Sequence, residues 1–438
     1  MLRLAVPLAL ANLGWMLMGF VDILMVSPLG AAAIGAGSLG NTLFYTLVVC
    51  GTGMLSGMDT LVSQAFGAGE VQDCRRTLIG GLWLGAALSP VLALLMWATV
   101  PLLRATGANP EVLALVAPYT KALLWGIPPL MCYSACTRYL QAINIVKPLT
   151  FAVVTANLLN LAGDWVLIYG HLGVRAMGLT GSAWSTSISR FLIAAVLAAA
   201  VLREERKAGY LLFHLSWVPD LARLWRLVRL GFPAAMQIVI EGGVFGAVTA
   251  LAARLDAASL AAHSLAINVV TVTYMVPLGI GSAAAVRVGQ AFGRKDRHGI
   301  AVSGWTALLM GGLFMAAAGV ALALAPRWIL QIYTRDAAVL AVGAGLLRIA
   351  ALFQLFDGFQ VVASGALRGL GDTHSPMLAH LAGYWIVGMP VVWVCCFTLG
   401  WGALGIWAGL CMALVLIGIA LVAVWRRNVR SAKIHLDL

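Results

Sequence analysis

The tetrapeptide Gln64-Ala65-Phe66-Gly67 occurs a second time as Gln290-Ala291-Phe292-Gly293. The offset from residue 64 to residue 290 is 226 residues, about half of the 438-residue chain. At the same offset Pro7 corresponds to Pro233. A repeat of this length predicts a chain built from two copies of one structural unit.

The composition is that of a protein whose solvent is lipid. Apolar residues make up 62% of the chain and charged residues 10%, with a mean hydropathy of +0.95, whereas soluble domains are about 25% charged. Runs long enough to cross roughly 30 Å of hydrocarbon lie at 4–26, 31–57, 78–103, 117–141, 148–169, 178–202, 225–251, 258–286, 300–325, 340–366, 375–398 and 403–425. We therefore predict an all-α polytopic membrane protein with twelve transmembrane helices, because a backbone in lipid must satisfy its hydrogen bonds internally.

The most hydrophilic stretch, residues 203–220, falls where the two repeats should join. We place the division at 210/211, with helices 1–6 in an N-lobe (1–210) and helices 7–12 in a C-lobe (211–438). Each repeat has an even number of spans, so both enter the membrane from the same side. The two six-helix bundles should then be related by a pseudo-two-fold axis along the membrane normal, an organisation typical of transporters.

The net charge of +12 is distributed unevenly along the chain. With the N-terminus in the cytoplasm, most lysines and arginines fall in cytoplasmic loops, including the clusters at 203–229, 287–297 and 426–433. This is the positive-inside pattern, and it predicts that both termini are cytoplasmic. No basic stripe interleaved with aromatic residues is left over, so we expect no nucleic-acid partner.

Ionisable residues inside the spans carry most of the functional information, because they are costly in lipid. In the N-lobe, Asp22 and Asp164 lie at similar depth, and Asn160 shares the helix face of Asp164 at i−4, with Asn157 one turn further in. This group offers several oxygen ligands and a titratable carboxylate. We predict a proton or cation site.

The C-lobe has its own candidate site. Glu241 lies near the middle of span 7 and Asp357 near the middle of span 10, while Gln237 shares the Glu241 face at i−4. A low-dielectric cleft favours the protonated form of a carboxylate, which allows proton loading, and a hard monovalent cation is the alternative occupant.

A purely structural interpretation of these acids is that each is hydrogen-bonded or paired with a buried partner such as Arg190. For His263 and Tyr384 we favour the structural interpretation, because a lone buried His or Tyr usually satisfies a neighbour.

These features resemble the multidrug and toxic compound extrusion (MATE) family over nearly the whole chain. The motifs in the first half are Pro7 with Asp22, Pro28-Leu29-Gly30, the twin Gln-Ala-Phe-Gly segments, and Asn157 to Asp164 leading to Tyr169-Gly170. Those in the second half are Gly231-Phe232-Pro233 with Glu241, Leu260-Ala261-Ala262-His263, and Asp357 followed by Leu367-Arg368-Gly369-Leu370-Gly371-Asp372-Thr373. Glu241 and Asp357 together resemble the NorM-like bacterial branch.

The resemblance implies a twelve-helix antiporter of the bacterial inner membrane that expels amphipathic, often cationic, compounds in exchange for Na+ or H+. It implies cation sites at Glu241 and Asp357, or at Asp22, Asn160 and Asp164. In some sodium-coupled members a Tyr lies one turn before the span-10 acid, where this chain has Phe353. The coupling ion therefore stays open. Apart from the coupling ion we expect no cofactor. We expect no required protein partner, only the bilayer and small substrates.

Two other functions fit parts of the sequence. A lipid-precursor flippase or a dedicated metabolite exporter could use the same helices, but a polyanionic headgroup would call for a cationic cleft, and the mid-span ionisable groups are mostly acidic. Gly369-Leu370-Gly371-Asp372 matches the G-x-G-D string of intramembrane aspartyl proteases. That chemistry needs a second aspartate that shares its proton, and we find no Tyr-Asp partner motif. We therefore expect a transporter and not an enzyme.

Overall fold

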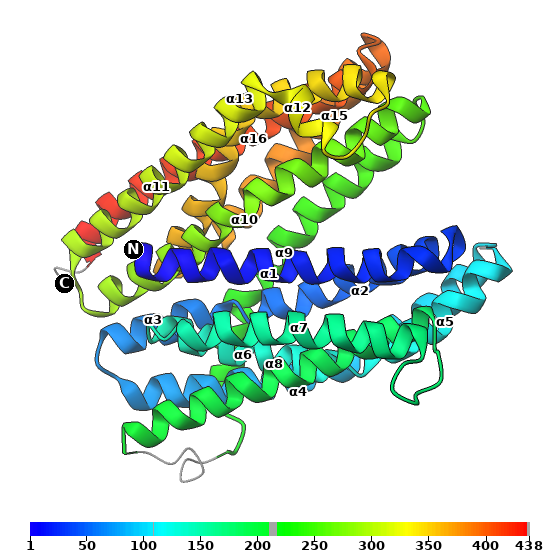
Figure 1. Cartoon of the computed structure of the whole chain (residues 1–438). Coiled ribbons are helices and arrows are strands. Elements are labelled where there is room, and N and C mark those ends of the chain that lie inside the picture. Colours follow the sequence, from blue (N-terminus) through cyan, green and yellow to red (C-terminus); the bar gives the residue numbers. More distant parts are fainter. Residues whose placement is uncertain (108, 210–216, 436–438) are drawn as a thin grey trace. The chain divides into compact units, whose positions relative to one another are not determined.

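The computed structural model describes residues 1–107, 109–209 and 217–435, and these are almost entirely helical (Figure 1). In the first half the helices are α1 (Leu2–Val26), η1 (Ser27–Leu29), α2 (Ala31–Met54), α3 (Gly57–Gly67), α4 (Val71–Ala105), α5 (Pro110–Leu124), α6 (Ile127–Ala142), α7 (Lys147–Tyr169) and α8 (Leu179–Lys207). In the second half they are α9 (Leu221–Ala252), α10 (Ala257–Gly293), α11 (Arg297–Leu324), α12 (Pro326–Gln331), α13 (Ala337–Leu370), α14 (His374–His380), η3 (Leu381–Gly388), α15 (Met389–Trp393), η4 (Val394–Thr398) and α16 (Gly402–His435).

The helices follow the predicted spans closely. Of the described residues, 11 helical segments are long and apolar enough to cross a membrane. The predicted span at 117–141 is the one missing from this set, because it is divided between α5 (15 residues) and α6 (16 residues). Counting this broken pair as one crossing gives the twelve helices that the sequence predicts.

The break between α5 and α6 has a packing reason. A Cβ atom at Gly126, between the two helices, would lie 2.8 Å from Nη1 of Arg190 and 3.1 Å from Oγ of Ser187. Glycine therefore makes room for a buried guanidinium on α8, and the prolines of α6 begin a new helix after it. The interruption is thus part of the way the protein accommodates an intramembrane arginine.

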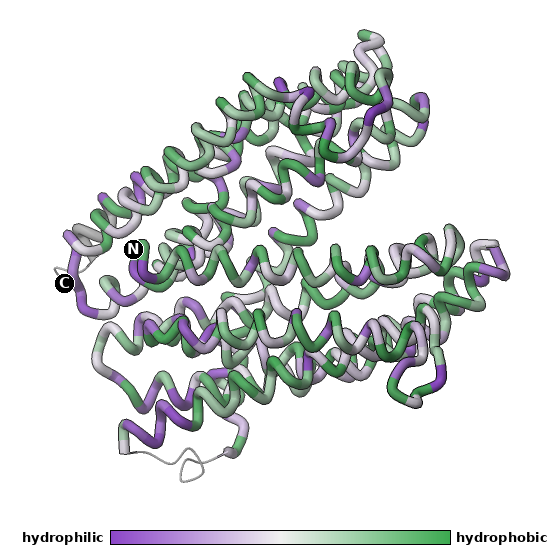
Figure 2. The backbone as a smooth tube through the Cα atoms, in the orientation of Figure 1, coloured by the Kyte–Doolittle hydropathy of each residue, from purple (hydrophilic) through white to green (hydrophobic). Residues whose placement is uncertain are grey.

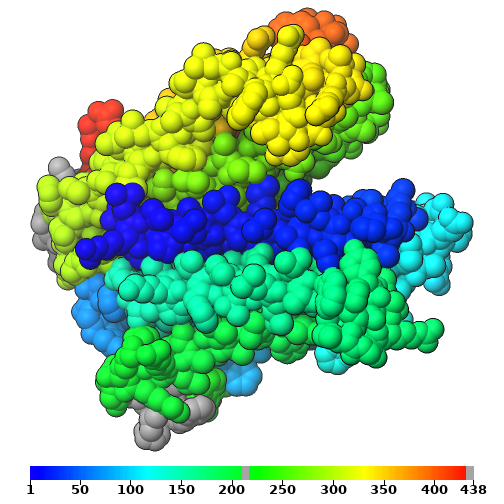
Figure 3. Space-filling model, in the orientation of Figure 1, coloured from blue at the N-terminus to red at the C-terminus, as the bar shows by residue number. Residues whose placement is uncertain are grey.

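The hydropathy of the helices agrees with a lipid environment. Figure 2 shows hydrophobic positions along the helices and hydrophilic positions gathered towards helix ends and loops. Large apolar side chains on α1, including Leu10, Leu17 and Phe20, are more than half exposed, and α1 lies at the surface in Figure 3. Such exposure is costly in water and natural in lipid. The chain is therefore a multi-pass membrane protein.

The residues cluster into two compact units. The N-terminal unit comprises Leu10–Phe66 and Glu70–Ala235, and the C-terminal unit comprises Met1–Ala9, Gly67–Gly69 and Met236–Leu438. The division that we predict at 210/211 lies outside the described residues. Within the C-terminal unit, α10, α13 and α16 pack against one another (Figure 1).

The predicted span at 375–398 is irregular. After α14, the segments η3 and η4 are π-helical, and they flank the short α15. A π-helical turn is wider than an α-helical one and often lies at a functional site. Here η3 follows directly after His380 and contains Tyr384, both fully buried.

The twin tetrapeptides occupy equivalent places in the fold. Each one ends a helix, since α3 ends at Gly67 and α10 ends at Gly293. The next helix begins within a few residues in both cases, at Val71 and at Arg297. The most visible repeat in the sequence therefore marks matching helix ends.

Candidate functional site

The C-terminal unit contains a cavity of about 320 Å³ between α9, α10, α13 and α16. Its walls are mostly apolar and aromatic, and they carry two carboxyl groups, from Glu241 and Asp357. The lining residues are Ile238, Glu241, Gly242, Phe245, Ile267, Val270, Thr271, Tyr274, Met275, Phe353, Asp357, Trp407, Leu410 and Leu414. A cavity of this size, with apolar walls and few polar groups, is typical of a small-molecule site.

Glu241 on α9 and Asp357 on α13 are joined by one amide side chain. Gln360 Nε2 lies 3.1 Å from Asp357 Oδ1 and 3.4 Å from Glu241 Oε1. Asp357 and Gln360 are 4% and 0% exposed, and the Glu241 side chain is 14% exposed. The two carboxyl groups that the sequence singles out therefore share one polar network at the wall of the cavity.

His380 extends this network away from the cavity. Its Nε2 lies 2.6 Å from Gln360 Oε1, and its Nδ1 lies 2.7 Å from the carbonyl oxygen of Pro376. The ring is fully buried, and its Nε2 is 3.9 Å from Glu241 Oε2. A backbone carbonyl can only accept, so Nδ1 must carry a hydrogen and donate to Pro376.

Two proton arrangements satisfy this network. In the first, His380 is an imidazolium that donates from Nε2 to Gln360 Oε1, and the Gln360 amide N–H groups donate to ionised carboxylates. In the second, the amide is rotated: its N–H donates to a neutral His380, and its oxygen accepts from a protonated Asp357 or Glu241. Each arrangement holds one proton. Without that proton, Gln360 Oε1 faces either the unprotonated Nε2 of His380 or a carboxylate oxygen, so two hydrogen-bond acceptors meet.

The other residues predicted for this site take different places. Gln237 does not bridge the acids directly; its Nε2 lies 3.3 Å from Ser364 Oγ and 3.4 Å from His380 Nε2. Phe353 is a cavity wall, and its ring stacks on Trp407 with centroids 5.9 Å apart. Trp407 Nε1 donates to Nδ1 of His263, whose Nε2 faces Thr249 Oγ1 at 3.1 Å. His263 thus satisfies its neighbours, as expected.

Tyr384 differs from that expectation. Its side chain is fully buried, yet its hydroxyl has no hydrogen-bond partner among the described residues. The ring packs edge-on against Phe245 and His380 instead. The π-helical η3 holds the ring in this position, which the sequence pattern does not indicate.

The N-terminal unit brings Asp22, Asn160 and Asp164 together. Asp22 on α1 lies next to Asp164 and Asn160 on α7, and Thr186 Oγ1 on α8 donates to Asp22 Oδ2 at 3.2 Å. Asn160 is held by Ser185, whose hydroxyl donates to the Asn160 backbone carbonyl at 2.8 Å. Both Asn160 and Asp164 are 0% exposed.

Several oxygens in this cluster have no donor. Among the described residues, no hydrogen-bond partner is present for Asp22 Oδ1, Asn160 Oδ1 or either carboxyl oxygen of Asp164. Buried acceptors without partners are costly unless they hold a proton or a cation. The adjoining cavity measures only about 40 Å³, which is room for a small ion or water and not for an organic molecule.

Arg190 on α8 supplies a positive charge to this cluster. It is 1% exposed, interacts electrostatically with Asp22, and lies with Cζ 4.0 Å from the centroid of the Phe44 ring. The amide nitrogen of Asn157 does not contact the acids. It donates to the carbonyls of Gly14 and Val153 at 3.1 and 2.8 Å. The N-terminal cluster is therefore a pair of acids with one built-in cation.

Sequence reasoning missed Gln360, His380 and Tyr274 at the C-terminal cavity. Gln360 lies three residues after Asp357 and so on the same helix face, which is a signal that the sequence does contain. His380 and Tyr274 come from other helices, and only the fold brings them to the acids. Asp372 of the G-x-G-D string accepts from Ser375 N and from Asn428 Nδ2, at 3.0 and 2.9 Å, so it secures the loop after α13.

Comparisons with known proteins agree with this architecture. The sequence model of the MatE family matches residues 7–166 and 233–394. A "Probable multidrug resistance protein NorM" of Mesorhizobium japonicum is 35% identical, with 98% of this chain and 94% of that protein covered. A protein of the same name from Bradyrhizobium diazoefficiens is 36% identical, over 93% and 88%.

Solved structures show the same fold. The outward-facing conformation of a multidrug resistance MATE family transporter has a TM-score of 0.91 at 19% identity, covering 99% of this chain and 96% of that one. The eukaryotic MATE transporter AtDTX14 has a TM-score of 0.86 at 19% identity, covering 99% and 98%. Because the family model matches both halves and the relatives align over nearly the whole chain, this protein belongs to the MATE family of membrane transporters, among NorM-named bacterial relatives.

Proposed function

We propose that this protein is a cation-coupled antiporter that exports amphipathic, often cationic, compounds across the bacterial inner membrane by alternating access, with both termini in the cytoplasm. The observation that carries the proposal is the C-terminal cavity, where two carboxyl groups lie in an apolar and aromatic wall. The names of the relatives, as probable multidrug resistance proteins, support drug export.

The chemistry of the cavity suits a broad range of amphipathic cations. Apolar walls gain affinity from buried area without demanding one ligand shape. Aromatic faces such as Trp407 and Phe245 attract a cationic group, and the carboxylates of Glu241 and Asp357 attract it more strongly. Selection by charge and apolarity, and not by shape, is the expected basis of a multidrug pocket.

The Gln360 network suggests how a proton and a cationic substrate compete. With one proton, every donor in the network meets an acceptor. When the proton leaves, two acceptors face each other and the carboxylates gain negative charge, which a substrate cation or Na+ relieves. Proton loading and cation binding are thereby mutually exclusive at this site.

Exchange follows if the two ligands favour opposite conformations. A ligand shifts a conformational equilibrium only by its difference in affinity between the two states. Proton or Na+ binding from outside would favour the state that releases substrate outside, and substrate binding from inside would favour return.

The proposal is tested by efflux of a fluorescent cationic dye from proteoliposomes, with proton and sodium gradients imposed separately. Glu241→Gln and Asp357→Asn remove the negative charges with little change in size. We expect each variant to lose at least tenfold of the gradient-driven efflux, and the effective gradient names the coupling ion.

Asp336→Asn is the matched control. This variant repeats the Asp-to-Asn change outside the cavity. The Asp336 carboxylate caps α13 by accepting from Ala338 N at 2.8 Å. Efflux by this variant should follow the wild type. Wild-type protein that moves no dye under either gradient, or acid variants that retain full efflux, would overturn the proposal.

A further inference from the structure

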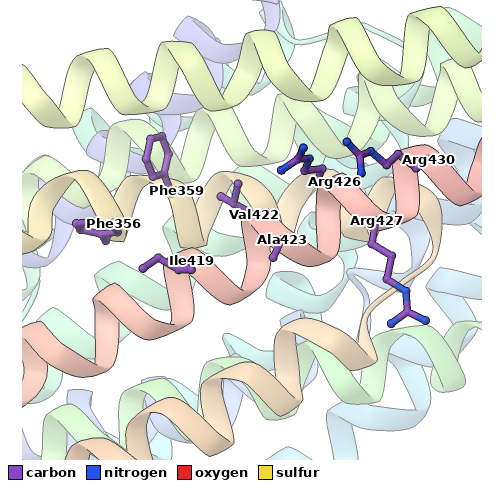
Figure 4. Close-up of a pocket in the computed structure, with 9 residues that line it drawn as sticks. Phe356, Phe359, Ile419, Val422, Ala423, Arg426, Arg427 and Arg430 are labelled. Atoms are coloured by element: carbon purple, nitrogen blue, oxygen red, sulfur yellow. The ribbon is translucent and has the colours of Figure 1, made fainter.

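A second and larger cavity lies away from the acids, in a groove between α13 and α16 of the C-terminal unit. Its volume is about 650 Å³. The lining residues are Phe356 and Phe359 of α13, and Gly418, Ile419, Val422, Ala423, Arg426, Arg427 and Arg430 of α16 (Figure 4). The groove is apolar at one end and carries three arginines at the other.

The floor of the groove is formed where the two helices touch. A Cβ atom at Gly418 would lie 2.9 Å from the carbonyl oxygen of Phe356, so only glycine allows this approach. On the buried side, Trp425 is 0% exposed and its ring packs over Gly304 of α11. Ile419 faces outward and is 55% exposed. The groove is therefore fixed by packing at its base and open along its length.

The spacing on α16 places the apolar and basic groups in one line. Ile419, Val422, Arg426 and Arg430 recur at intervals of three and four residues, which is one face of a helix. Figure 4 shows Arg426 and Arg430 on the side of α16 that bears Val422, whereas Arg427 points the other way. Two guanidinium groups thus stand at the end of an apolar track.

The length of this track matches one membrane leaflet. From Ile419 to Arg430 the helix advances 11 residues, or about 16 Å, and half of the hydrocarbon core is about 15 Å. The helix α16 carries no charged residue from Gly402 to Trp425, and its first arginines follow at 426, 427 and 430. The arginines therefore lie where lipid phosphates would lie, and the apolar end reaches towards the bilayer centre.

The arginines are not occupied by the protein itself. Within the described part of the chain, Arg426 and Arg430 have no ion pair or hydrogen bond, and the groove is lined by no acidic side chain. The nearby acid Asp372 is held instead by Asn428 at 2.9 Å, which lies on another face of α16. The positive charge is available to a ligand.

We propose that this groove binds one anionic phospholipid, with its phosphate between Arg426 and Arg430 and an acyl chain along Val422, Ile419 and the rings of Phe356 and Phe359. Guanidinium groups match phosphate geometry and are less strongly hydrated than ammonium groups. Basic pockets at the ends of transmembrane helices bind lipid headgroups in this way. The site is separate from the carboxylates of the transport cavity.

The test counts lipids that remain bound to the purified full-length protein by native mass spectrometry, after exchange into nanodiscs of phosphatidylglycerol or phosphatidylcholine. We expect one phosphatidylglycerol to be retained by the wild type. The double variant Arg426→Gln/Arg430→Gln should bind it roughly 30-fold more weakly, for two arginines near the membrane surface. Arg294→Gln is the matched control, because it removes the same charge from an exposed position that does not line the groove, and its affinity should stay within threefold of the wild type.

A second arm separates a lipid from a free phosphate. Val422→Trp fills the track and leaves both arginines, so this variant should also lose the lipid. Inorganic phosphate should not displace the lipid from the wild type. Retention of phosphatidylcholine equal to that of phosphatidylglycerol, an equal loss in Arg294→Gln, or displacement by inorganic phosphate would overturn the proposal. Thermal unfolding of each variant in detergent without lipid reports any failure to fold.

Discussion

The two units each bury a pair of acids, but they surround the pair differently. In the N-terminal unit, Asp22 and Asp164 lie beside a buried arginine, Arg190, and a cavity of about 40 Å³. In the C-terminal unit, Glu241 and Asp357 line a cavity of about 320 Å³. His380 Nε2 lies 3.9 Å from Glu241 Oε2, and this side chain is charged only when protonated.

This contrast separates two uses of a buried carboxylate. A permanent guanidinium next to the N-terminal pair offsets one negative charge whatever the pH, and the small cavity excludes an organic ligand. The C-terminal pair has room, and no arginine or lysine is among the described residues that line its cavity, so its charge changes with its occupant. We infer that a cationic substrate meets the C-terminal pair and that the N-terminal pair serves a proton or a small ion.

The largest effect on stability should come from the permanent counter-charge. Arg190→Met removes a guanidinium that is 1% exposed and interacts electrostatically with Asp22, and leaving a buried charge without compensation costs up to about 3–5 kcal/mol. We expect a large fall in the midpoint of thermal unfolding. Glu241→Gln and Asp357→Asn should move the same midpoint little, because no permanent charge depends on them.

A double variant distinguishes charge balance from loss of packing. Arg190→Met/Asp22→Asn removes both charges, so it should recover at least half of the stability lost in the single variant. If the double variant is as unstable as Arg190→Met, the arginine acts through its contacts with Gly126 and Phe44 and not as a counter-charge.

The next effect concerns ligand affinity. Asp357→Asn should weaken equilibrium binding of a cationic dye to the purified protein at least tenfold, about 1.4 kcal/mol, because the variant removes a charge from the cavity wall. Asp164→Asn makes the same change in the other unit, and its affinity should stay within twofold. Fluorescence anisotropy measures both. An equal loss of dye affinity in the two variants would contradict the proposal that the substrate binds at the C-terminal acids and not at the N-terminal ones.

Hydropathy was enough to predict the helices, since each crossing must be apolar and about 20 residues long. The break at Gly126 was the exception, because its cause is the Arg190 side chain from another helix. The acids could also be found from the sequence, because an ionised group in lipid is costly enough to be conspicuous. The structure brings Asp22, Asn160 and Asp164 together and joins Glu241 to Asp357 through Gln360. The other two predicted members, Asn157 and Gln237, make their hydrogen bonds elsewhere.

The surroundings of the acids could not be predicted in the same way. Gln360 shares a helix face with Asp357, but His380 and Trp407 lie on other helices. Nothing in their local pattern indicates that Trp407 lines the cavity or that His380 joins the network behind it. From the sequence, Arg190 is a possible partner for any of the acids, and His380 is not singled out. In the fold, Arg190 interacts electrostatically with Asp22, and His380 lies behind Gln360.

A smaller effect should follow from removing the amide that joins the C-terminal acids. Gln360→Met keeps the length of the side chain and removes its donors and acceptor. We expect proton-driven efflux to fall roughly fivefold, the range of one or two hydrogen bonds, with dye affinity within twofold of the wild type. His380→Gln should resemble it. His374→Gln, at an exposed position, is the control. Unchanged efflux in Gln360→Met would show that transport does not depend on the proton network.

The smallest effect compares the helix caps of the two units. Asp256 caps α10 by accepting from the Ser259 hydroxyl and from Ser259 N, at 2.7 and 2.9 Å, whereas Asn109 caps α5 by accepting from Glu111 N at 2.9 Å. The hydrogen bonds from Ser259 hold the pKa of Asp256 below its ordinary value of 3.8. A depressed pKa contributes stability that is present above the unfolded value and is lost as the pH falls through the folded one.

Asp256→Ala and Asn109→Ala should therefore each lower the midpoint of thermal unfolding by about 1–2 °C near neutral pH, the size expected for one cap in a chain of this length. As the pH falls from neutral through 3.8 and below it, the deficit of Asp256→Ala should shrink, because the wild-type carboxylate also loses its charge there. The deficit of Asn109→Ala should stay constant, since an amide does not titrate. A constant deficit in both variants would mean that the charge of Asp256 contributes nothing beyond its hydrogen bonds, and the pH dependence of the protein would then have to come from the buried acids of the two units.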